Sequence, residues 1–158
     1  MSTTSIRAAV VDDAAALADL HLDVWDDGYT GLVPQSVLDA RRATPKAERV
    51  TMWEKRLTGS ATTWVAEDED GLVGFASAGK GRDGSGMWEL MALYVRARVY
   101  GTGVGHALFR ATIGDRPAFL WVLVGNERAT RFYERQGFRA DGQEQSCDEG
   151  LERRMVRS

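Results

Sequence analysis

The sequence predicts a mixed α/β fold in which helices flank a central sheet of about seven strands. Short apolar runs that are typical of strands alternate with amphipathic segments of helical spacing along the chain. No internal repeat, low-complexity linker or change in composition divides it. Its length of 158 residues is typical of one domain with a sizeable core. We therefore expect a single domain spanning residues 1–158.

The N-terminal third is predicted to be mainly helical. A first strand is expected over residues 6–11, and Asp12 and Asp13 then offer an N-cap. Apolar residues recur behind them at helical spacing, which predicts a helix to about Asp26. Residues 28–34 are predicted as a break. A short helix after Pro34 and a longer helix over residues 45–57 complete this part.

The rest of the chain is predicted to contain most of the sheet. Asp70-Gly71 is a hairpin signal. Asn126 is a plausible N-cap for a helix, and Gly137 is placed to end that helix in the left-handed conformation, with Phe138 as its hydrophobic contact. Strands are expected at residues 62–68, 72–80, 87–95, 118–124, 138–146 and 151–157, with helices ending near Ile113 and spanning residues 126–136.

Charge and composition exclude several classes of function. The net charge is −3 and the pI about 5.4, which argues against a nucleic-acid partner and does not favour an anionic membrane surface. One cysteine, Cys147, excludes an internal disulfide, and with only two histidines we expect no metal site. No secretory signal or membrane-spanning run is evident, so a cytoplasmic protein is expected.

The strongest local signal is a glycine-rich turn before a helix, in the segment "YVRARVYGTGVGHALFRAT". Gly101, Gly103 and Gly105 stand at alternate positions where the helix begins. The unpaired N–H groups of a helix N-terminus can bind a phosphate there without any basic side chain. The spacing fits neither a Walker A loop nor a dinucleotide fingerprint. A tight turn with no ligand is the alternative interpretation.

A second segment, "NERATRFYERQGF", adds a family resemblance. With "LYVRARVYGTGVGHAL", from which one helix and one apolar strand separate it, it resembles the acetyl-CoA-binding core of the GCN5-related N-acetyltransferase (GNAT) superfamily. The resemblance covers roughly residues 65–138. It implies a mostly antiparallel mixed sheet that is splayed between its fourth and fifth strands, acetyl-CoA as co-substrate, and direct attack in a ternary complex.

The resemblance also implies a set of cofactor-binding residues. The backbone of the fourth strand pairs with the pantetheine arm, Asn126 bonds that arm, and the glycine loop holds the pyrophosphate. Tyr100 stands where the family usually has Arg or Gln, so this chain departs from the family at the position whose long polar side chain often bonds the pyrophosphate. The implied residues are Leu93, Tyr94, Val95, Tyr100, Gly101, Thr102, Gly103, Val104, Gly105, His106, Asn126 and Tyr133.

Two residues are candidates for proton transfer. Tyr133 matches the family tyrosine that points at the cofactor sulfur, and we interpret it as the acid; its helical spacing also suits a core residue. Glu89 is the candidate base, on a strand face shared with Met91 and Leu93. An exposed strand residue is the alternative for Glu89. Cys147 has no base or orienting partner in its surroundings and is not expected to be a nucleophile.

The sequence says least about the residues that bind the acceptor. Trp25, Tyr29 and Glu89 are candidates for binding a cationic amine through aromatic and charge contacts. Asp23, Asp26 and Asp27 surround the aromatic pair, although we favour a solvated face for these acids.

The sequence thus predicts an acetyl-CoA-dependent N-acetyltransferase acting on a small-molecule primary amine. Three alternatives stay open, namely a non-catalytic acyl-CoA-binding module, a peptide or protein N-terminal acetyltransferase, and a purely structural domain. A homodimer is common in the family, and the final strands are the expected place for pairing.

Overall fold

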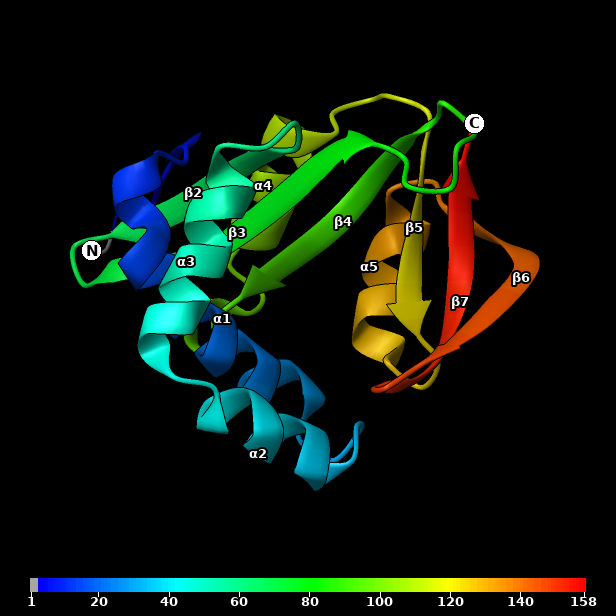
Figure 1. Cartoon of the computed structure of the whole chain (residues 1–158). Coiled ribbons are helices and arrows are strands. Elements are labelled where there is room, and N and C mark those ends of the chain that lie inside the picture. The colour runs from blue at the N-terminus through cyan, green and yellow to red at the C-terminus, as the bar shows by residue number, and fades with distance from the viewer. Residues whose placement is uncertain (1–2) are drawn as a thin grey trace.

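A computed structural model describes residues 3–158, which form one mixed sheet flanked by helices (Figure 1). The strand order is β1-β2-β3-β4-β5-β7-β6, and only β4 and β5 pair in parallel. The predicted α/β class is therefore confirmed. The strands are β1 (Ser5–Ala8), β2 (Thr62–Asp68), β3 (Gly71–Lys80), β4 (Trp88–Val95), β5 (Ala118–Leu123), β6 (Arg139–Cys147) and β7 (Gly150–Arg157).

Helices cover both faces of the sheet (Figure 1). α1 and α3 pack with Phe75 and Val65 on one face, whereas α4 packs with Val73 and Ala76 on the other. α5 packs on β5 and β7 through Tyr133. No helix within residues 3–158 is long and apolar enough to span a membrane. The helices are α1 (Ala14–Tyr29), α2 (Gln35–Ala43), α3 (Lys46–Leu57), α4 (Val104–Thr112) and α5 (Glu127–Arg135), with short 3-10 turns η1 (Val11–Asp13) and η2 (Ala97–Val99).

Two predicted boundaries in the N-terminal third are wrong. β1 ends at Ala8 rather than at residue 11, because the chain turns into η1. The Asp13 carboxylate accepts the Val10 N–H at 2.8 Å and pairs with Arg7 at 2.8 Å, so it stabilises this turn and does not cap α1. α1 continues past Asp26 to Tyr29, whose ring packs edge-on against an aromatic residue one turn earlier.

The sheet opens between β4 and β5. The two strands pair only at Trp88–Ala118 and Glu89–Phe119, at their N-terminal ends. Beyond these pairs they diverge, and Figure 1 shows the gap widening between the green and the yellow strand. The predicted splay between the fourth and fifth strands is confirmed. The facing backbone edges have no strand partner there, and such groups need a hydrogen-bonding partner when buried.

A β-bulge in β4 changes which side chains share a face. Ser77 of β3 pairs with Ala92, but the next β3 residue pairs with Leu90, which leaves Met91 as the extra residue. A bulge shifts by one position the alternation of side chains between the two faces of the strand. The prediction that Glu89, Met91 and Leu93 share one face is therefore wrong. Leu93 packs with the α4 and α5 side of the sheet, whereas Tyr94 packs with α1.

The predicted caps of α5 are confirmed. The Asn126 side chain accepts the Ala129 N–H at 3.3 Å, as an N-cap does. At the other end Gly137 has a φ of 94°, and the Phe138 N–H bonds back to the Tyr133 carbonyl at 3.1 Å. Phe138 is fully buried, so local sequence fixes both ends of this helix.

Replacing Gly74 by Ala should destabilise the sheet. A Cβ at Gly74 would lie 2.8 Å from the Tyr94 carbonyl oxygen and 3.0 Å from Leu108 Cδ1. We expect a loss of about 1–3 kcal/mol in the free energy of unfolding, measured by urea denaturation. Gly28→Ala is the matched control, because a Cβ at this helical position meets nothing closer than 3.9 Å. An equal loss in both variants would contradict the packing argument.

Candidate functional site

Two cavities meet where β4 and β5 separate. The first, which we call the glycine-loop cavity, has a volume of about 650 Å³ and lies between β4, β5, α5 and the loop before α4. The second, which we call the acidic cavity, has a volume of about 570 Å³ and opens on the side of α1 and the β6–β7 hairpin. The residues that line both cavities are Tyr29, Met91, Tyr94, Trp121 and Leu123.

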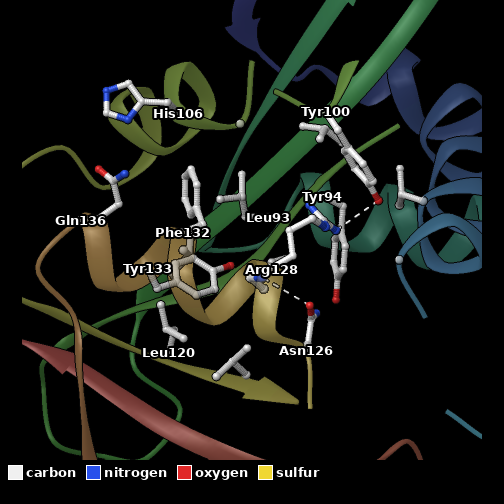
Figure 2. Close-up of a pocket in the computed structure, with 18 of the residues that line it drawn as sticks. Leu93, Tyr94, Tyr100, His106, Leu120, Asn126, Arg128, Phe132, Tyr133 and Gln136 are labelled. Carbon is white, nitrogen blue, oxygen red and sulfur yellow. Dashed lines mark hydrogen bonds between the residues drawn. The ribbon is translucent and has the colours of Figure 1, made fainter. Parts of the chain in front are cut away.

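The predicted cofactor-binding residues gather around the first cavity, and Figure 2 shows several of them facing it. The side chains of Thr102 and Val104 do not line it. Thr102 Oγ1 donates to the Val99 carbonyl at 2.6 Å, and Val104, the first residue of α4, is buried with Val73 and Ala76 of the sheet, so these two side chains stabilise the loop. The predicted residues that do line the cavity are Leu93, Tyr94, Val95, Tyr100, Gly101, Gly103, Gly105, His106, Asn126 and Tyr133.

The glycine loop exposes backbone N–H groups to this cavity. Gly101 and Gly103 have φ values of 75° and 92°, in the left-handed region that favours glycine. The Ala107 N–H bonds to the Gly103 carbonyl, and the earlier N–H groups of α4 have no acceptor within the helix. These groups and the positive end of the helix dipole form a ready site for an anion.

The charges lining the two cavities are opposite in sign. Arg128, Arg135 and His106 line the glycine-loop cavity, and among the described residues no carboxylate does. The acidic cavity is lined by one arginine, Arg82, and by four carboxylates, those of Asp83, Glu89, Glu149 and Glu152. One opening in the sheet is therefore suited to an anion on one side and to a cation on the other.

Tyr133 is held in α5 by neighbouring rings. It is 9% exposed and contacts Phe132 and Phe138 edge-on. Burial raises the pKa of its phenol above the ordinary value, so the hydroxyl stays protonated at neutral pH. Tyr133 packs in the core and also lines the glycine-loop cavity, so its place in the core is confirmed and its role as the acid stays a prediction.

Glu89 is buried rather than exposed and is paired with Arg82. Its side chain is 3% exposed, and Arg82 Nη2 donates to Oε2 at 2.6 Å. Oε1 accepts from both the Arg82 backbone N–H and Nε, each at 3.1 Å. The loop between β3 and β4 therefore places a guanidinium over the predicted base. Neither the pairing nor the role of Arg82 was predicted from the sequence.

Trp25 and Tyr29 line the acidic cavity, but an arginine side chain rather than a group of aspartates lies against Trp25. The Tyr29 hydroxyl lies 2.9 Å from that of Tyr94, at the wall shared by both cavities. The guanidinium of Arg41 lies 3.6 Å from the Trp25 ring centroid. Arg41 therefore occupies the position over this ring where a bound cation could stack. Trp25 is 9% exposed and belongs mainly to the core.

The acids near these aromatic residues point elsewhere. Asp23 pairs with Arg96 at 2.7 Å, Asp26 pairs with Arg42, and Asp27 accepts the Ala97 N–H at 2.9 Å. None of the three lines either cavity. The solvated face that we favour for these acids agrees with their contacts outside both cavities.

The carboxylates that do line the acidic cavity come from the C-terminal hairpin. Glu152 pairs with Leu123 in the register of β5 and β7, and Glu149 lies in the β6–β7 turn. The sequence carried no local signal for these residues, because long-range strand pairing brings them to the site. Cys147, in the same hairpin, donates to the Gly150 carbonyl, and burial raises its pKa to about 11.

Within residues 3–158 no group of three or more His, Cys, Asp or Glu side chains is arranged to hold a metal ion. The arrangement offers a phosphate-sized set of N–H donors, an unpaired strand edge, a buried phenol and a buried carboxylate around one opening.

Comparisons with known proteins agree with this geometry. The family model of the acetyltransferase (GNAT) domain matches residues 59–140. A probable N-acetyltransferase of Mycobacterium tuberculosis, Rv2775, is 28% identical over 145 residues, covering 89% of this chain and 83% of that protein. The uncharacterized N-acetyltransferase YuaI of Bacillus subtilis is 32% identical over 136 residues, covering 77% of this chain and 73% of that protein.

A solved structure shares the fold. The PaiA N-acetyltransferase of Thermoplasma acidophilum, determined in complex with coenzyme A, superposes with a TM-score of 0.72 at 16% identity, covering 96% of this chain and 98% of that one. The parallel β4–β5 pair and the splay beyond it are thus features of a known architecture. The chain belongs to the GCN5-related N-acetyltransferase (GNAT) superfamily.

Proposed function

We propose that this protein transfers the acetyl group of acetyl-CoA to a primary amine of a small molecule, by direct attack in a ternary complex. The observation that carries the proposal is the pair of oppositely charged cavities that meet at the β4–β5 opening. The donor carries phosphates, and the acceptor amine is cationic in water. Each substrate therefore has a side of the sheet that attracts it, and the reacting groups come together at the shared wall.

The donor fits the glycine-loop cavity in three ways. The N–H groups at the start of α4 suit its pyrophosphate. The unpaired edge of β4 from Leu93 to Val95 suits the amides of its pantetheine arm, which can add to the sheet as a short strand does. Asn126 uses its carbonyl oxygen as the N-cap, so its amide nitrogen is left to donate to that arm. The thioester then lies near Tyr133.

The reaction needs three changes of bonding or charge. The amine nitrogen attacks the thioester carbon, the C–S bond breaks, and the sulfur leaves as a thiolate while the nitrogen loses a proton. Tyr133 stabilises the departing sulfur. Because burial raises its pKa, its contribution is greatest as a hydrogen-bond donor to the developing thiolate, with the proton finally supplied through solvent.

The amine proton is assigned to Glu89, directly or through water. The carboxylate lines the acidic cavity on the face of β4 that also carries Tyr94. Its hydrogen bonds with Arg82 fix its orientation. Cys147 is not required as a nucleophile, since its raised pKa of about 11 leaves it a neutral thiol at neutral pH.

The first test is thiol release from acetyl-CoA against a panel of amines, amino acids and short peptides. We expect turnover with one class of small amine, and a loss of about 100-fold in kcat for Tyr133→Phe with little change in the dissociation constant for CoA. Turnover that is preserved in Tyr133→Phe would reject the role of Tyr133. Binding of acetyl-CoA without turnover of any amine or peptide would favour the binding-module alternative.

A second pair of variants separates the base from its partner. Glu89→Gln should lower kcat by about 100-fold, because the proton acceptor is lost. Arg82→Gln should lower kcat much less, since the carboxylate remains. Initial rates at saturating acetyl-CoA measure both effects. If the two variants lost activity and unfolding free energy equally, the pair would be a structural ion pair and the base assignment would be wrong.

The acidic cavity should select cationic acceptors. Glu149→Gln and Glu152→Gln should each raise the KM for the cationic acceptor by roughly 3- to 10-fold, with kcat nearly unchanged and the effect smaller at high salt. Glu127→Gln is the matched control, because its carboxylate is on the exposed side of α5 and pairs with Arg131. An equal rise in KM in the control would show that only net charge matters.

A further inference from the structure

The glycine-loop cavity contains an arginine that the family resemblance did not assign. The Arg128 guanidinium lies 3.9 Å from the ring centroid of Tyr100, and its Nη2 donates to the Tyr100 hydroxyl at 3.1 Å. Figure 2 shows this pair at one end of the cavity. We propose that Arg128 binds a phosphate group of the donor and that Tyr100 is the residue that positions it. This inference rests on the proposed function.

Arg128 has the free donors that such a role needs. The bond to Tyr100 uses one of the five N–H groups of its guanidinium, and within residues 3–158 no carboxylate pairs with it. Arg131, one turn later in the same helix, pairs with Glu127 instead. An arginine fork that is free of a carboxylate partner and lines a cavity suits a phosphate, whose oxygens can accept two parallel hydrogen bonds.

The guanidinium is held in place from three elements. Arg128 comes from α5, Tyr100 from the segment that follows β4, and Gly28 from α1. A Cβ on Gly28 would lie 3.9 Å from Arg128 Nη2 and 4.0 Å from the Tyr100 hydroxyl, so α1 lies alongside the pair. Stacking on a ring and contact with a helix reduce the conformational freedom that the side chain loses on binding a ligand.

The position of the charge is unfavourable without an anion. Arg128 is the second residue of α5, near the positive end of the helix dipole, where a cation is destabilising. The adjoining loop from Tyr100 to Gly105 has no charged side chain of its own. A phosphate between the loop and α5 would neutralise the guanidinium and the two helix N-termini together. Tyr100 thus contributes a ring that orients the guanidinium of Arg128, which belongs to α5.

The test compares donors with and without phosphates. Arg128→Gln should weaken CoA binding by about 10- to 100-fold in titration calorimetry and reduce the salt dependence of binding. With acetylpantetheine, which has no phosphate, kcat/KM should stay as in the unchanged protein. Arg131→Gln, with the same change in charge on the same helix, should bind CoA normally. Tyr100→Phe should have a small effect and Tyr100→Leu a larger one, because only the former keeps the ring.

Dephospho-CoA identifies which phosphate is bound. An equal loss with CoA and dephospho-CoA supports contact with the pyrophosphate, and a loss confined to CoA supports contact with the 3′-phosphate. Unchanged CoA binding in Arg128→Gln, or an equal loss with acetylpantetheine, would overturn the inference and leave the proposed function intact. Failure of the unchanged protein to bind CoA at all would overturn both.

Discussion

The early end of pairing between β4 and β5 is the constraint on which the site depends. After Glu89 and Phe119 the two strands separate, although both continue as strands for several more residues. Their facing N–H and C=O groups then lack a partner, which is costly unless water or a ligand supplies one. A peptide-like arm in the opening meets that requirement. The backbone of the opened sheet therefore offers hydrogen-bonding groups to a ligand, and side chains are free to set charge and chemistry.

The bulge at Met91 adapts the same strand to two tasks. Before the bulge Glu89 faces the acidic cavity, and after it the shifted alternation turns Tyr94 to that side and Leu93 to the other. Without the extra residue, Leu93 and not Tyr94 would face the acidic cavity. One inserted residue thus places a hydroxyl at the shared wall and an apolar surface against α5. Periodicity alone predicts the wrong face, because the sequence does not mark where the bulge occurs.

Features that depend on local interactions were predicted well. The bounds of β2 agree with the expected residues 62–68, and both ends of α5 were located because Asn126 and Gly137 act on their own neighbours. The glycine loop is equally local. The missed parts of the site depend on long-range geometry. Glu152 reaches the acidic cavity only through the register of β7 on β5, and no periodicity in the sequence pairs Tyr100 with Arg128.

The distribution of charge explains how an acidic protein can bind a polyanionic donor. The net charge of −3 opposes a phosphate at long range, but at ordinary salt concentration fields are screened within about 10 Å. Binding then depends on local groups, and the glycine-loop cavity has N–H donors, Arg128 and no carboxylate lining. The carboxylates that line the acidic cavity lie on the opposite side of the opening, away from the glycine loop. The basic and the acidic side chains thus line different cavities, so the local charge at the glycine loop differs from the net charge of the chain.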